Sequence, residues 1–174
     1  MAALLVAAKY EEIYPPEIKD LLAALENKFT KPEILEMEQK ILSTLEFDFF
    51  VPSSYRFLQR YQKISTTATD DKIFFFAQYL SEVCLLDTFF LQFPPSKIAA
   101  ATFMLSAKSV KGVNAWNGEM EKWSGINASS EEMTRLITEV KKFLEEINAK
   151  FLPSLQYKFN KDEYLQVAKI PFKF

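Results

Sequence analysis

The sequence predicts an all-α protein, and three observations lead to that prediction. Apolar residues recur with helical spacing along most of the 174 residues, and no segment alternates convincingly as a strand. Prolines and capping residues stand just before several of these apolar segments, where they suit the first turn of a helix. Hydrophobic residues make up 49% of the chain, which is enough to bury a sizeable helical core.

Three helices are expected in the first part of the chain. Their expected ranges are 2–10, 16–26 and 31–45. Pro15 and Pro16 should open the second helix, since proline suits a first helical turn. Thr30 and Glu33 have the spacing of a capping box, which predicts where the third helix begins.

An extended linker at residues 46–52 should separate two domains, residues 1–50 and 51–174. This segment has no helical pattern, and Pro52 disfavours helix at the residue before it. Five helices and a tail are expected in the second domain. Their expected ranges are 53–63, 69–86, 95–110, 114–122 and from a cap at 129–132 to about 150, followed by about one more turn near 162–167.

Two short segments of the chain are similar to each other. AALLVAAK at 2–9 aligns with ATFMLSAK at 101–108 at an offset of 99 positions (108 − 9). Their small residues would let neighbouring helices pack closely, so each is expected to be the central helix of its own bundle. Two helices precede the second copy and none precedes the first. Residues 2–8 are apolar all round, so we expect either a fragment or another partner that covers this helix.

Five segments of the sequence resemble the mitotic A/B-type cyclins. They are AALLVAAKYEEIYPPEI (2–18), FTKPEILEMEQKILSTLEFDFFVP (29–52), YRFLQRY (55–61), LSEVCLLD (80–87) and FPPSKIAAATFMLSAK (93–108). The resemblance implies tandem cyclin boxes, of which the first is incomplete and keeps its last three helices only. The second is a complete five-helix bundle with a tail. The resemblance implies that the first two helices of the first box are missing. The hydrophobic substrate-docking patch of mitotic cyclins and any N-terminal degradation signal are then missing as well.

The resemblance also implies a function. Cyclins bind and activate a cyclin-dependent protein kinase, so we expect a regulatory subunit in a heterodimer that acts in cell-cycle control at G2/M. We expect it in the nucleus and cytoplasm. The kinase-binding residues implied by the resemblance are Lys9, Tyr10, Glu12, Ile13, Glu38, Leu42, Phe47 and Phe49.

In the family, a Lys and a Glu at the positions of Lys9 and Glu38 converge and hydrogen-bond the backbone around the kinase C helix, on which Tyr10 packs. The residues implied for the same apolar groove are Leu42, Phe47 and Phe49, and those implied for the kinase activation segment are Glu12 and Ile13. This is recognition of a helix in a groove. Moving the C helix inward completes the Lys–Glu ion pair on which kinase catalysis depends.

Taken by themselves, these residues have simpler interpretations. Lys9 would be a solvated helix end, and Glu38 an ordinary surface carboxylate. Leu42 would belong to the core. Phe47 and Phe49 could equally well cover the joint between the two boxes. The resemblance to cyclins, and not the chemistry of any single residue, favours the kinase-binding interpretation.

The sequence offers little for catalysis, cofactors or metals. It contains no His, the commonest general base and metal ligand. Glu11 and Glu12 are adjacent on a helix and so do not face each other as a catalytic carboxylate pair must. Cys84 lies in an apolar helix, where burial is expected. We therefore expect no enzyme activity, no cofactor and no metal.

Charge and hydropathy argue against nucleic acid and membrane as partners. The formal net charge is −2, without the basic excess that nucleic-acid binding requires. Apolar stretches fall short of the roughly 20 residues of a membrane span. The alternatives are a cyclin-fold transcription factor that binds nucleic acid, and a truncated, non-activating cyclin fragment that competes for partners. Kinase substrates stay possible partners, although the docking patch is absent.

Overall fold

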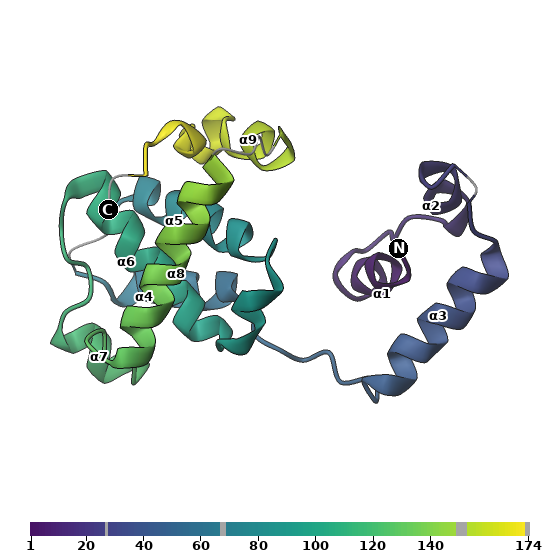
Figure 1. Ribbon diagram of the computed structural model, residues 1–174, viewed down its shortest axis with the longest axis horizontal. Helices are drawn as coiled ribbons and strands as arrows, with labels where there is room; N and C mark the ends of the chain where they lie inside the picture. The colour runs from purple at the N-terminus through teal and green to yellow at the C-terminus, as the bar shows by residue number, and fades with distance from the viewer. Residues whose placement is uncertain (27, 67–68, 149–152, 173–174) are drawn as a thin grey trace. The chain divides into compact units, whose positions relative to one another are not determined.

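The residues described by the computed structural model are 1–26, 28–66, 69–148 and 153–172. Within these ranges all regular structure is helical, with no strand, so the predicted all-α class is confirmed (Figure 1). The chain divides into two compact units, Met1–Val51 and Pro52–Phe174. None of the helices in the described ranges is long and apolar enough to cross a membrane.

Three helices make up the first unit. They are α1 (Ala2–Glu11), α2 (Ile18–Ala24) and α3 (Lys31–Thr44). Both α1 and α2 pack against α3, and a small core of Leu5, Leu21 and Ile34 forms where they meet. Leu4 is 55% exposed. One side of α1 is therefore open to solvent in the described part of this unit.

The predicted start of α3 is confirmed, and the predicted start of α2 is wrong. The hydroxyl and the backbone N–H of Thr30 both donate to Glu33 Oε2 at 2.7 Å, and these two hydrogen bonds lower the pKa of the Glu33 carboxyl. In contrast, α2 begins only at Ile18 and not at Pro16. Glu17, itself extended, is the N-cap.

The second unit contains the expected five-helix bundle and a tail. The bundle helices are α4 (Ser54–Ile64), α5 (Asp71–Cys84), α6 (Pro95–Lys111), α7 (Gly118–Ser124) and α8 (Glu131–Asn148). The predicted start of α7 at 114 is too early, since the Asn117 side chain caps the helix by accepting from the Met120 N–H at 3.0 Å. The expected end of the long helix near 150 lies outside the described residues.

Several short helices were not predicted from the sequence. They are α9 (Pro153–Phe159) and the 3-10 helix at Thr88–Gln92. Two further 3-10 turns, at Asp162–Tyr164 and Val167–Lys169, replace the single turn expected in the tail. Segments this short contain too few residues to show a helical period.

The α6 helix lies at the centre of the second unit, as predicted. It contacts α4, α5 and α8 (Figure 1). Ala99, Ala101 and Ala107 are fully buried, and their small side chains let the neighbouring helices approach closely. The Ser106 hydroxyl donates to the Ile73 carbonyl of α5 at 2.6 Å, so this buried polar group is satisfied across the helix interface.

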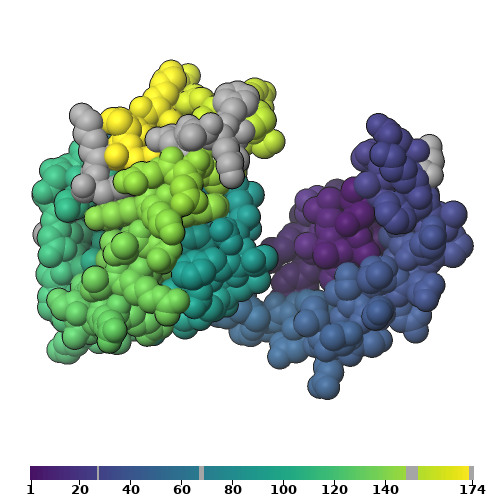
Figure 2. Space-filling model, viewed as in Figure 1, coloured from purple at the N-terminus to yellow at the C-terminus, as the bar shows by residue number. Residues whose placement is uncertain are grey.

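The C-terminal tail packs on α5. Phe159 of α9 is fully buried, and its ring centroid lies 5.2 Å from that of Tyr79 on α5 and 4.9 Å from that of Tyr164. Figure 2 shows the C-terminal residues, in yellow, covering one end of this unit. The tail therefore completes the hydrophobic core of the second unit.

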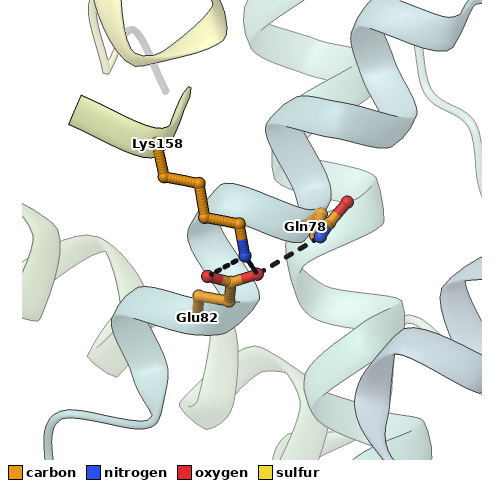
Figure 3. A network of polar contacts seen from close by, with 3 residues as sticks. All are labelled: Gln78, Glu82 and Lys158. Atoms are coloured by element: carbon orange, nitrogen blue, oxygen red, sulfur yellow. Dashed lines mark hydrogen bonds and ion pairs between the residues drawn. The ribbon is translucent and has the colours of Figure 1, made fainter. Parts of the chain in front are cut away.

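An ion pair also joins the tail to α5. Lys158 Nζ donates to both carboxylate oxygens of Glu82, at 2.7 and 2.9 Å, across 76 positions of sequence (Figure 3). Gln78 Nε2 donates to Glu82 Oε1 at 3.2 Å from one turn earlier on the same helix. Both charged side chains remain partly exposed, so the pair is expected to contribute at most about 1 kcal/mol.

The internal repeat makes a matched stability prediction possible. Leu4 and Phe103 occupy equivalent positions of the two copies, but Phe103 is fully buried whereas Leu4 is mostly exposed. We expect Phe103→Ala to lower the free energy of unfolding by about 3–5 kcal/mol, and Leu4→Ala by about 1 kcal/mol or less. Urea unfolding followed by circular dichroism measures both changes. Equal losses would contradict the difference in burial.

A second pair of substitutions separates the two contacts of the tail. Phe159→Ala should destabilise the second unit by about 3–5 kcal/mol, because it opens a cavity against Tyr79. Lys158→Met should cost about 2 kcal/mol or less, because it removes a partly exposed ion pair and the contacts of the ammonium with the Phe159 and Tyr164 rings. Both variants can be compared by urea unfolding followed by tryptophan fluorescence, since Trp116 and Trp123 both lie in this unit. A larger loss for Lys158→Met would show that the ion pair holds the tail.

Candidate functional site

The structure brings Lys9 and Glu38 together in the first unit. Lys9 lies in the last turn of α1, and Glu38 lies midway along α3, which packs beside it (Figure 1). Lys9 Nζ donates to Glu38 Oε1 at 2.8 Å. The two residues are 29 positions apart in sequence, so only the packing of α1 on α3 makes this contact possible.

Glu38 is buried, and the interpretation of it as an ordinary surface carboxylate is wrong. The residue is only 7% exposed, whereas the Lys9 side chain is 48% exposed. A buried carboxylate is costly unless it is paired and hydrogen-bonded, and Lys9 provides both the charge and the hydrogen bond. The exposed part of Lys9 leaves donor capacity for a further acceptor, since an ammonium offers three N–H groups.

A strained turn directs the chain after α3 back towards α1. The Phe47 N–H donates to the Leu42 carbonyl at 3.1 Å, and the Glu46 N–H to the Ser43 carbonyl at 3.3 Å, the two bonds of a Schellman motif. Glycine is usual at this left-handed position, but here Glu46 and Phe47 have φ of 50° and 59°. Left-handed backbone costs a non-glycine residue roughly 1–2 kcal/mol. Such strain often accompanies functional sites.

The strained turn places one aromatic side chain against α1. The Phe49 ring lies 5.9 Å from the Tyr10 ring, centroid to centroid, in a tilted arrangement. Phe49 and Leu42 are half-buried, whereas Tyr10 and Phe47 are exposed. The core interpretation of Leu42 is therefore only partly right. The Phe47 ring remains accessible to a partner.

The segment after α1 is the most exposed part of the site. Glu12 caps α1 with an extended backbone, and Ile13 is 89% exposed. Two further exposed aromatic residues, Tyr14 and Phe50, flank the expected site residues and were not predicted from the sequence. The sequence does contain a sign of their exposure. Tyr14 stands next to a proline and Phe50 lies in the expected linker, and in both places no core can cover a large side chain. Exposed apolar side chains of this size indicate an interaction surface.

We call the residues expected to bind a kinase the α1–α3 surface, since all of them lie on α1, on α3 or in the segments that follow these helices. It is defined by Lys9, Tyr10, Glu12, Ile13, Glu38, Leu42, Phe47 and Phe49. An ammonium and a carboxylate lie next to exposed apolar side chains, an arrangement that can bind backbone groups and apolar side chains of a partner helix. That these residues bind a kinase stays a prediction.

Within the described residues, no three His, Cys, Asp or Glu side chains gather where they could hold a metal ion. Cys84 is buried, and burial raises the pKa of its thiol to about 12. The thiol is therefore protonated at neutral pH and unsuited to act as a nucleophile, as expected from its apolar helix.

Curated relatives of this chain are mitotic cyclins. A protein of Dictyostelium discoideum named G2/mitotic-specific cyclin-B is 32% identical over 172 residues, which cover 98% of this chain and 38% of that protein. Cyclin-B1-1 of Arabidopsis thaliana is 34% identical over 98% of this chain and 40% of its own length. The G2/mitotic-specific cyclin-A of Drosophila melanogaster is 31% identical over 96% of this chain and 33% of its own length. The chain thus spans less than half the length of these relatives.

Family models divide the chain in the same order as the two structural units. Residues 1–49 match the cyclin N-terminal domain, and residues 52–173 match the cyclin C-terminal domain. The described helices agree with a cyclin-box fold, in which a small-residue helix lies at the centre of the complete box. The chain therefore belongs to the cyclin family, and its relatives are the A/B-type mitotic cyclins.

Proposed function

We propose that this protein binds a cyclin-dependent protein kinase through the α1–α3 surface and shifts that kinase towards its active state. Cyclins are regulatory subunits, and in this proposal the chain supplies contacts and no chemistry. The observation that carries the proposal is the buried Glu38 carboxylate paired with the half-exposed Lys9 ammonium, beside exposed apolar side chains.

The chemistry of the surface fits the end of a partner helix. Helix ends leave backbone N–H and C=O groups without partners. Lys9 can donate to such carbonyls, and the second oxygen of Glu38 can accept from such N–H groups. Tyr10 and Phe47, both exposed, can lose their water contacts against an apolar helix face. Polar and apolar groups together set both the position and the affinity of the bound helix.

Activation follows if the surface binds one conformation of the kinase better than the other. The kinase C helix carries the Glu that must pair with the catalytic-site Lys. A surface that binds this helix only in its inward position shifts the population towards the active kinase. The exposed Glu12 and Ile13 would meet the activation segment of the kinase.

The proposal extends to the cell-cycle phase and the compartment. Two of the relatives above carry the words G2/mitotic-specific in their names. We propose that this protein acts at G2/M as well, in the nucleus and cytoplasm. Its abundance through a synchronised cell cycle and the location of a fluorescent fusion test these two points separately from kinase binding.

A double-mutant cycle tests Lys9 and Glu38 as one unit. Lys9→Ala and Glu38→Ala should each weaken kinase binding by about 2–5 kcal/mol, since each leaves its partner group unpaired at a partly buried interface. The double variant should lose less binding free energy than the sum of the losses in the two single variants. Calorimetry measures binding, and phosphate transfer to a histone substrate measures activation.

The matched control is an exposed ion pair of the same unit. Lys19→Ala removes the pair that Lys19 makes with Glu17 at 2.9 Å and should leave kinase binding unchanged. Circular dichroism shows whether Lys9→Ala still folds, because that variant leaves Glu38 buried without its ammonium. Wild-type binding by both single variants would overturn this assignment. Binding without activation would instead favour a non-activating competitor.

A third substitution distinguishes apolar from ionic contributions. Tyr10→Ala should weaken kinase binding by about 2 kcal/mol or more, since aromatic side chains dominate such interfaces. The loss of binding free energy in Tyr10→Ala should be the same at low and high salt. The loss of binding free energy in Lys9→Ala should shrink as the salt concentration rises. Leu91→Ala, at an exposed apolar residue of the second unit, is the control. If the loss of binding free energy in Tyr10→Ala changed with the salt concentration, the contact would not be apolar.

A further inference from the structure

The second unit repeats the helix pair of the α1–α3 surface but not its charges. At the offset of 99 positions that relates the two copies, Lys9 corresponds to Lys108 on α6, and Glu38 corresponds to Ile137 on α8. The pair α6–α8 packs together as α1–α3 does. The lysine is therefore retained in the second unit, while the carboxylate that neutralises it in the first is replaced by an apolar side chain.

Lys108 has no carboxylate partner among the described residues. It is exposed, and none of the ion pairs formed within the described ranges includes it. Lys111, one turn further along α6, pairs with Asp70 at 3.1 Å. Lys108 is thus the lysine near this end of α6 whose charge is left for a binding partner.

A groove of about 390 Å³ lies beside Lys108, and we call it the Lys108 groove. Met104, Val113 and Ile137 are half-buried and line it with apolar side chains, and Lys108 and Lys141 contribute the charges. No Asp or Glu of the described residues lines the groove. At one end Gly112, with φ of 69°, terminates α6 and turns the chain aside.

The electrostatics of the groove favour a negatively charged group. The C-terminal end of a helix carries a partial charge of roughly −0.5, which opposes an anion at the end of α6. The full charge of the Lys108 ammonium outweighs that partial charge. The apolar lining restricts the ligand further, because a free inorganic anion would leave Met104, Val113 and Ile137 in contact with water.

We propose that the Lys108 groove binds a peptide segment of a partner protein that carries an Asp or Glu side chain next to an apolar one. The carboxylate of the peptide takes the place that Glu38 occupies in the first unit and pairs with Lys108. The apolar side chain of the peptide packs on Ile137 and Met104. This binding is independent of the proposed kinase contact, since it uses residues of the second unit only.

Selection from a random peptide library tests the proposal on the full chain. Phage-displayed peptides of about 15 residues are long enough to form short helices. We expect the enriched peptides to share an acidic residue beside a large apolar one. Synthetic copies, followed by fluorescence anisotropy, should bind Lys108→Glu about tenfold or more weakly at low salt. Replacing the peptide's Glu with Gln should weaken binding similarly.

Lys142→Glu is the matched control. Lys142 is exposed and adjacent to Lys141 on α8, but it does not line the groove, and neighbouring helical residues face different directions. Peptide binding should be the same in this variant as in the wild type. The proposal is overturned if no peptide is enriched, if the enriched peptides are neutral or basic, or if Lys108→Glu binds them as the wild type does. Binding of a phosphoserine version alone would also overturn the carboxylate assignment.

Discussion

Close packing around a helix of small residues determines where most of the second unit lies. Ala99 and Ala107 on α6 have no side chain beyond Cβ, so α4, α5 and α8 approach its backbone closely. Polar groups on α6 are satisfied without water, as when the Thr102 hydroxyl donates to the Ile98 carbonyl at 3.0 Å. Near the lysines at the C-terminal end of α6, its neighbours leave a groove.

The first unit uses the same kind of helix with fewer neighbours in the described structure. The interface of α1 with α3 contains a carboxylate, Glu38, where a purely apolar contact would be less costly to bury. Lys9 offsets this cost by donating to the carboxylate. Stability and the proposed binding therefore depend on the same two side chains. The strained turn at Glu46 and Phe47 likewise precedes Phe49, whose ring lies against Tyr10.

The two units show how one helix arrangement can carry different charges. In each of the helix pairs α1–α3 and α6–α8 the two helices pack together, and the offset of 99 positions places a lysine at the same point of both pairs. One substitution, Glu38 in the first pair and Ile137 in the second, changes which charges are satisfied internally. A fold supplies positions, and the side chains at those positions decide what is recognised. The proposed kinase contact and the proposed peptide groove are two outcomes of that difference.

The sequence by itself determined the all-α class, the capping box at Thr30, the central helix of the second unit and the internal repeat, because these follow from local periodicity and spacing. It also assigned the chain to a family, and so the site residues expected of that family. Only the tertiary structure decided that Glu38 is buried against Lys9, that Phe159 of the tail fills the core, and that Lys108 lines an apolar groove. Burial and ion pairing depend on residues far apart in sequence, and no local pattern contains that information.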